Sequence, residues 1–229
     1  VVFRGTRDSS RRGDSESAGE RTAERNCADV LSLARMTGPY EWNPMPHVLD
    51  VACPTCRSAA LFEFAEVVRI HRRDDIPFFE ESSLFEHQMF DGGAQGRWHG
   101  AVYYSLLHGP AETTIDNLPA GYAPSDWNHS TFLYRSHGTD EGAVACGGCG
   151  RRARHHLDWP SDALFQIAYR GQVLWAFHRE SAQELRDYVA SANRNRQGYR
   201  WELFLRHVPT VFLTAKARET VVKRLDRIL

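Results

Sequence analysis

The chain has 229 residues, of which 42% are hydrophobic and 25% are charged, and its formal net charge at pH 7 is −1. This composition is typical of a soluble globular protein that can bury a sizeable core, and it excludes a strongly basic or strongly acidic chain. No window approaches the roughly 18 consecutive apolar residues of a membrane span, and no segment resembles a signal peptide. We therefore expect a cytoplasmic protein without a membrane partner.

The N-terminal segment is predicted to be disordered. Residues 1–26 contain charged residues, Ser and Gly but almost no apolar side chains. Such a segment cannot offset the entropy cost of ordering its backbone. We predict a disordered tail over residues 1–35 and a single folded domain over residues 36–229. Cys27 lies in the tail and is expected to be a free thiol.

The first predicted elements are strands. Residues 48–52 are rich in β-forming residues, and residues 61–70 (LFEFAEVVRI) fit either a strand or a helix, with Phe and Val favouring the strand. Residues 57–145 contain many turn formers, with short aromatic runs at 101–107 and 131–135 between them. We interpret this stretch as a β-rich insertion.

The C-terminal part is predicted to begin with a hairpin and continue as helices. Residues 163–178 contain strong β formers on both sides of a turn at 170–172. Ser181, with Glu184 three residues later, forms the pattern of a helix N-cap with a capping box. A final helix is predicted over residues 214–229. Its inward face would consist of Val221, Val222, Leu225 and Ile228.

Two CxxC pairs carry the strongest chemical signal. A structural zinc site needs four ligands, and two knuckles of two thiolates each supply a tetrahedral set. Glycines 147, 148 and 150 suit a tight knuckle, because glycine accepts the positive φ that such turns demand. CxxC pairs also favour a metal in a reducing compartment over a disulfide framework. We expect one structural Zn²⁺, held by Cys53, Cys56, Cys146 and Cys149.

The spacing between the pairs is unusual. Residues 57–145 separate them, whereas about 12–20 residues is usual for zinc pairs. Closing the longer loop costs about 1.3 kcal/mol more, which is small beside the roughly 10–16 kcal/mol that structural zinc contributes in peptides. A shared site is therefore compatible with an insertion that folds by itself.

Two other interpretations of the cysteines remain open. Cys53 and Cys56 alone would suit a redox pair, which requires a helix directly behind them. A catalytic zinc deaminase would show H-x-E followed by P-C-x-x-C. Residues 178–180 spell H-x-E but follow both cysteine pairs, and P-C-x-x-C does not occur.

The pairs CPTC and CGGC, followed by DWPSDALFQIAYRGQVLWAFHRE and FLTAKARETVVKRL, resemble a group of bacterial zinc-ribbon proteins of uncharacterised activity. These have two widely separated CxxC pairs and a basic helical C-terminal region. The resemblance covers the knuckles and most of residues 144–229. Together with the element pattern it implies an α+β fold, in which a zinc-ribbon core is split by a β-rich insertion and followed by C-terminal helices.

The charge distribution suggests a partner. Residues 57–145 contain 6 Arg and Lys against 13 Asp and Glu, a formal charge of −7, and residues 181–229 contain 10 against 5, a formal charge of +5. A basic face attracts polyanions, and arginine interleaved with Tyr199, Trp201 and Phe204 suits single-stranded nucleic acid. These aromatic residues also fit a helix core. The predicted nucleic-acid-binding residues are Arg151, Arg152, Arg154, Arg196, Arg200, Lys216 and Arg218.

Two alternative functions are retained. The acidic and aromatic segment 78–90 (FFEESSLFEHQMF) would suit a protein-interaction adaptor, whose binding should resist added salt. An enzyme would use a His/Asp/Glu site in the insertion, although no H-E-x-x-H, G-x-S-x-G or phosphate-cradling loop is present. The candidate residues are Glu86, His87, Asp91, His99, His108, Asp126 and His129.

Overall fold

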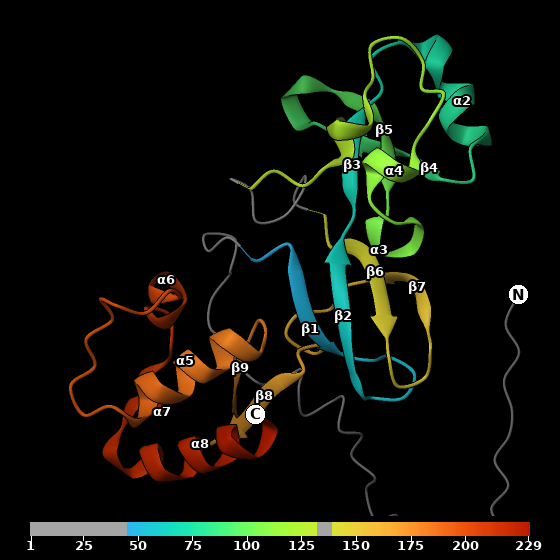
Figure 1. Cartoon of the computed structure of the whole chain (residues 1–229). Coiled ribbons are helices and arrows are strands. Elements are labelled where there is room, and N and C mark those ends of the chain that lie inside the picture. The colour runs from blue at the N-terminus through green and yellow to red at the C-terminus, as the bar shows by residue number, and fades with distance from the viewer. Residues whose placement is uncertain (1–44, 132–138) are drawn as a thin grey trace, which may run out of the picture.

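The computed structural model describes residues 45–131 and 139–229. Within these ranges the protein is mixed α+β, with three antiparallel sheets and a helical C-terminal part (Figure 1). The predicted tail at residues 1–35, with Cys27, lies outside the described residues, as does most of the aromatic run at 131–135. No helix in the described ranges is both long enough and apolar enough to cross a membrane.

The two cysteine-bearing hairpins share one sheet. Strands β1 (Val48–Ala52), β2 (Ala59–Phe64), β6 (Glu141–Cys146) and β7 (Arg152–His156) are ordered β1-β2-β6-β7, and each neighbouring pair is antiparallel. The predicted insertion (57–145) is therefore too long at both ends, because residues 59–64 and 141–146 belong to this sheet, and from here on the insertion means residues 65–140. The sheet therefore aligns the two hairpins side by side.

The insertion forms a second sheet. The chain continues from β2 directly into β3 (Glu66–Arg69), which pairs with β5 (Arg97–Tyr103), and β5 pairs with β4 (Phe85–Asp91). The strand predicted over 61–70 is thus confirmed as two consecutive strands that link the sheets (Figure 1). One face of this sheet packs into a separate core of Ile70, Phe79, Phe85, Ala101, Tyr103, Ala111, Ile115 and Trp127.

Short helical segments connect the strands of the insertion. They are η2 (Arg73–Asp75), α2 (Ile76–Glu81), η3 (Gly93–Gln95), α3 (Ser105–His108), α4 (Ala111–Thr114) and η4 (Pro124–Trp127). The last of these places Trp127 over the second sheet, where its indole N–H donates to the Ala101 carbonyl at 3.0 Å. This bond satisfies the polar end of an otherwise apolar buried ring.

The predicted C-terminal hairpin is confirmed. Strands β8 (Phe165–Tyr169) and β9 (Gln172–Ala176) are joined by Arg170 and Gly171, with φ values of 50° and 74°. Two successive positive φ values are the mark of the tight turn that matches strand twist. The hairpin is tied to β1, where the Asp50 N–H donates to the Phe177 carbonyl at 2.9 Å.

Four helices complete the C-terminal part: α5 (Arg179–Ala190), α6 (Glu202–Leu205), α7 (Thr210–Leu213) and α8 (Ala215–Ile228). On α8, the predicted inward residues Val221 and Leu225 are buried, and Val222 and Ile228 are half-buried. The predicted final helix is therefore confirmed with nearly its expected bounds.

The predicted cap of α5 is wrong by three residues. The N-cap is His178, whose Nδ1 accepts from the Ser181 N–H at 3.3 Å, and the Ser181 hydroxyl oxygen accepts from the His178 N–H at 3.0 Å. Ser181 thus occupies the third helical position of the capping box. Glu184 instead accepts from the backbone N–H groups of Arg200 and Trp201 at 3.0 and 2.8 Å, which fixes the loop after α5.

One hydrophobic core joins the first sheet to the C-terminal part. Phe62 from β2 belongs to the same buried cluster as Trp175 from β9, Leu185 from α5 and Leu225 from α8. Cys53 and Cys146 belong to this cluster as well. The cysteine-bearing turns are consequently anchored in the main core, whereas the insertion is built around its own.

Gly142 on β6 has no room for a side chain. A Cβ atom there would lie 2.3 Å from the Glu63 carbonyl oxygen and 2.4 Å from the Phe62 ring. We expect Gly142→Ala to destabilise the protein by at least the roughly 1–3 kcal/mol typical of overpacking. Gly147→Ala is the control, because a Cβ there meets nothing within 4 Å and its φ is not positive. Equal melting temperatures for both variants would contradict the β2–β6 packing.

Candidate functional site

The two CxxC pairs lie in the turns of the two hairpins. Cys53 and Cys56 lie between β1 and β2, and Cys146 and Cys149 lie at the β6–β7 turn. Because Cys146 is paired with Ala60, both turns reach the same end of the sheet (Figure 1). The β2–β6 register therefore places the second knuckle beside the first.

The four sulfur atoms form one cluster. All lie within 4.8 Å of one another, with 3.8 Å between the Sγ atoms of Cys53 and Cys149 and 3.6 Å between those of Cys56 and Cys146. A disulfide would need about 2.05 Å, and all four thiols are free. The predicted ligand set is thus brought together in an arrangement that can hold a metal ion.

The two turns share one backbone design. The Cys53 N–H donates to the Ser58 carbonyl and the Cys146 N–H donates to the Arg151 carbonyl, both at 2.8 Å. The residue after the second cysteine of each pair has a positive φ, 61° at Arg57 and 71° at Gly150. The same turn is therefore built twice, once with arginine and once with glycine in the left-handed position.

The sequence predicted positive φ values for the three glycines of the second turn, and only one of them has such a value. Gly150 has it, and Gly147 and Gly148 do not. Gly148 instead lies close to the first turn, where a Cβ would be 3.2 Å from the side chain of Ser58. A small residue at this position lets the two knuckles approach each other.

Hydrogen bonds in the turns favour thiolates. The hydroxyl and N–H of Ser58 lower the pKa of Cys56 to about 6, and the Cys56 N–H lowers the pKa of Cys53. The Arg151 N–H also favours the Cys149 thiolate, yet the neighbouring thiols and burial together raise the pKa of Cys149 to about 11. A bound cation would favour every thiolate at once.

The structure separates the predicted nucleic-acid-binding residues into two groups. Arg151, Arg152 and Arg154 lie on or beside β7, whereas the remaining four lie after α5 and on α8, away from β7 (Figure 1). Arg154 contacts the insertion, with its guanidinium 2.6 Å from the Glu86 carboxylate. One short ligand would not span both groups.

The C-terminal group is partly engaged within the fold. Arg200 pairs with Glu180 at 2.9 Å, and the Nε of Arg218 is buried. Arg196 and Lys216 are exposed. Phe204, one of the interleaved aromatic residues, is buried in the main core. This ring is therefore not available to stack on a base.

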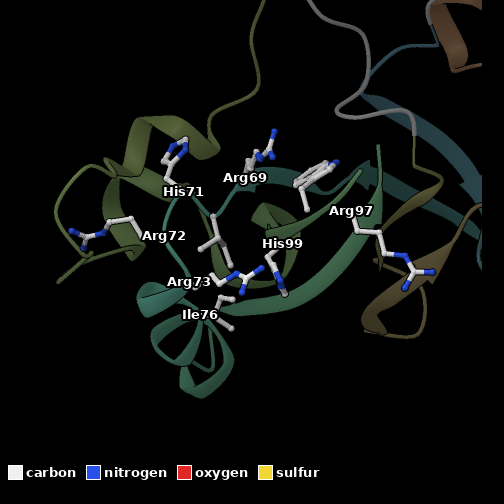
Figure 2. A pocket seen from close by; sticks show the side chains of 9 residues that line it. Arg69, His71, Arg72, Arg73, Ile76, Arg97 and His99 are labelled. Carbon is white, nitrogen blue, oxygen red and sulfur yellow. The ribbon is translucent and has the colours of Figure 1, made fainter. Parts of the chain in front are cut away.

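A basic pocket in the acidic insertion was not foreseen from the sequence. Four of the six basic residues between 57 and 145 line one pocket of about 200 Å³. Figure 2 shows Arg72 and Arg97 extending toward opposite sides of this group, with Arg69 on a third side. The full lining is Arg69, Ile70, His71, Arg72, Arg73, Ile76, Arg97, Trp98 and His99.

Three of the four arginines are available to a ligand. Arg72 donates to both carboxylate oxygens of Asp75, at 2.8 and 3.1 Å, and thereby closes its own turn. Arg69, Arg73 and Arg97 are exposed, and within the described ranges no carboxylate lies within 4.0 Å of them. Their charges are therefore uncompensated locally.

An aromatic pair adjoins this pocket. The rings of Phe90 and Trp98, opposite each other on β4 and β5, stack at 4.5 Å with an interplanar angle of 18°. The Arg69 guanidinium lies 6.0 Å from the Trp98 ring, and Phe90 covers Gly100, where a Cβ would lie 2.5 Å from the ring. The sheet thus presents two half-buried aromatic rings beside the uncompensated Arg69.

Two of the candidate enzyme residues are brought together. His87 Nε2 and His99 Nδ1 are 2.8 Å apart, and His87 Nδ1 is 2.9 Å from a Glu80 carboxylate oxygen. If Nδ1 of His87 donates to Glu80, its Nε2 accepts from His99, and the outer nitrogen of His99 stays free of this chain of contacts. His99 also lines the basic pocket.

The other candidate enzyme residues serve local structure. Asp91 and Asp126 accept from backbone N–H groups in their own turns, at 2.9 and 2.8 Å. Glu86 accepts from the Tyr104 hydroxyl at 2.9 Å, and burial lowers the pKa of His108. His129 contacts Glu66, outside the basic pocket.

The segment proposed for an adaptor supplies core residues. Phe79 and Phe85 are buried in the core of the insertion. Met89, at 54% exposure, is the most exposed of its large apolar side chains. The aromatic character of this segment is therefore explained by folding.

The two left-handed positions generate a paired prediction. Gly150→Ala should destabilise the protein by about 1–2 kcal/mol, the cost of a side chain at positive φ. Arg57→Gly should be neutral or stabilising by up to about 1 kcal/mol, because it removes that cost from the first turn. Thermal unfolding of both variants tests this; equal destabilisation by the two changes would contradict the shared turn geometry.

Comparisons with protein-family models, with curated proteins and with solved structures found no match to this chain. The resemblance to bacterial zinc-ribbon proteins therefore stays a hypothesis that rests on the cysteine pairs and the segments quoted with them.

Proposed function

We propose that Cys53, Cys56, Cys146 and Cys149 hold one structural Zn²⁺ and that the protein so stabilised binds single-stranded nucleic acid. The zinc proposal is supported by the sulfur spacing. A tetrahedron with Zn–S distances of about 2.3 Å has edges of about 3.8 Å, and two of the sulfur–sulfur distances between the pairs are 3.6 and 3.8 Å. The fold would then be a zinc ribbon interrupted by the insertion.

The same contacts disfavour a redox pair. Each of them joins one CxxC pair to the other. The chain behind Cys56 enters strand β2, whereas a redox CxxC is expected to precede a helix. Four thiolates would also leave no open coordination position, so the zinc would be structural.

Removing one sulfur should destabilise the main core, because Cys53 and Cys146 are part of it. We expect Cys146→Ser to lower the melting temperature by several degrees, at roughly 2–4 °C per kcal/mol for a chain of this size. A zinc chelator should lower it in the parent protein but not further in the variant. Cys27→Ser is the matched control; a melting temperature unchanged by Cys146→Ser and by chelator would contradict the proposal.

The basic pocket is the observation that carries the nucleic-acid proposal. Arg69, Arg73 and Arg97 concentrate positive charge in a segment whose formal charge is −7. Arginine beside stacked aromatic rings matches the needs of a single strand, in which phosphates pair with guanidinium groups and bases stack. Phe90 and Trp98 supply the rings.

The arginines are spread, which favours an extended polyanion over a single phosphate. Arg97 and Arg69 point to different sides of the group in Figure 2. From Trp98 the same face of the second sheet leads to Glu86 and Tyr104, where the Arg154 guanidinium lies 5.1 Å over the tyrosine ring. We therefore retain Arg151, Arg152 and Arg154 as a continuation of this surface. Arg196, Arg200, Lys216 and Arg218 would form a separate surface.

The Glu80–His87–His99 contacts favour a second candidate, an enzyme acting on the bound nucleic acid. His99 lines the pocket, and a histidine oriented by a second group is suited to general acid–base chemistry. This activity would require the same pocket to bind phosphates first.

Binding is tested with a labelled single-stranded oligonucleotide, by fluorescence anisotropy at several salt concentrations. Affinity should fall as salt rises, and changing Arg69, Arg73 and Arg97 together to Ala should reduce the salt slope by about 2, at roughly 0.7 per phosphate contact. The probe is also checked for cleavage. Cleavage by the parent protein that is lost in His99→Ala would identify an enzyme. A probe that stays intact would identify a binding module.

The matched control removes the same charge elsewhere. Lys223, Arg224 and Arg227 on α8 are exposed, lie outside the predicted binding residues, and can all be changed to Ala. The control should bind like the parent. Binding that is insensitive to salt, or equal losses in the two triple variants, would contradict the proposed surface.

A further inference from the structure

A second cluster of metal-ligating side chains lies apart from the cysteines. His47 directly precedes β1, Glu66 begins β3, and His129 follows η4. One nitrogen of each histidine and one carboxylate oxygen of Glu66 lie within 4.8 Å of one another. The cluster therefore lies where β2 passes into β3, between the two sheets.

The contacts converge on two carboxylates. His129 Nδ1 is 2.7 Å from Glu66 Oε1, and His47 Nε2 is 3.6 Å from the same oxygen and 3.4 Å from Glu63 Oε1. Within the described ranges, histidines are the only cationic side chains within 4.0 Å of Glu63 and Glu66. Among the described residues, two carboxylates thus meet two imidazoles without an arginine or lysine.

His47 has unmet hydrogen-bonding capacity. Its side chain is 9% exposed, and neither ring nitrogen has a hydrogen-bond partner among the described residues. Its backbone is held in place, because its carbonyl accepts from the Phe64 N–H at 3.1 Å. A buried polar group without a partner is costly, so a buried imidazole aimed at two carboxylates calls for a further group between them.

Protonation of the two imidazole rings would not by itself stabilise this cluster well. The two imidazole rings stack at 3.6 Å with an interplanar angle of 11°. If both were protonated, two positive charges would lie face to face. A single divalent cation would balance both carboxylates and accept a lone pair from each ring.

We propose that His47, Glu66 and His129, with Glu63 as a further donor, bind one divalent transition-metal ion. Imidazole and carboxylate donors suit Zn²⁺, Co²⁺, Fe²⁺ and Mn²⁺, in contrast to the all-sulfur set of the cysteines. Binding would require the stacked ring planes to diverge so that both lone pairs point at the ion.

The site adjoins a cavity on the side of its two histidines. His47 and His129 line a cavity of about 540 Å³ that also includes His178, Arg200 and Trp201. Coordination positions that the protein leaves empty would be filled by water from this cavity. An ion here could thus act on a bound ligand, whereas one enclosed by four thiolates could not.

The test is a titration with Co²⁺ of the full-length protein that has been stripped of metal and reloaded with one equivalent of zinc, which fills the four-cysteine site, followed by visible absorption. We expect one further equivalent to bind with the weak bands of nitrogen and oxygen ligands and without the intense near-ultraviolet charge-transfer band of cobalt thiolates. That band would instead report binding at the cysteines, so failure of the zinc proposal would be recognised separately.

Two variants locate the ion. Glu66→Gln and His129→Asn should each weaken Co²⁺ binding at least about tenfold, since even outer partners of metal ligands have effects of that size. Glu141→Gln is the control, because Glu141 pairs with His156 at 2.8 Å on the exposed surface. Absence of a saturable site, or equal binding by Glu66→Gln, His129→Asn and the control, would overturn the proposal.

Discussion

Strands β2 and β6 pair over five residues, from Ala60 opposite Cys146 to Phe64 opposite Gly142, with the insertion between them in sequence. This pairing closes a long loop, and the close contact at Gly142 shows how tightly the strands are joined. Loop closure costs little per added residue once the loop folds by itself. The shared sheet, the meeting of the cysteine pairs and the position of the insertion all follow from this one register.

A metal ion at the end of this sheet would reinforce the same closure. The β2–β6 ladder and a four-thiolate zinc would constrain the same two hairpins from the same end, and two of the cysteines belong to the main core. Because β2 continues almost directly into β3, the first sheet is joined to the sheet of the insertion at this point. There the second sheet positions arginines and aromatic rings that are far apart in the sequence, and the junction itself gathers Glu66 with His47 and His129.

Much of the fold could be predicted, because local signals determine it. The CxxC spacing predicted that the four cysteines come together. Enrichment in β-forming residues predicted a strand over 61–70 and the hairpin at Arg170 and Gly171. The N-cap at His178 could not be predicted, because histidine is not among the residues that are preferred at the N-cap of a helix. The basic pocket was hidden because Arg69 and Arg97 lie on different strands of a segment with excess acid, so an average of charge along the chain conceals them. His47, Glu66 and His129 share no local motif.

Metal content of the full chain tests the central claim most directly. Elemental analysis would compare the parent with variants in which Cys53 and Cys56, Cys146 and Cys149, or all four are changed to Ser. A single shared site predicts that either double change removes the same one equivalent of zinc, and that changing all four removes no more. A smaller loss of zinc for one double change than for the change of all four cysteines, or losses that add between the pairs, would show that the pairs act separately and would contradict the account.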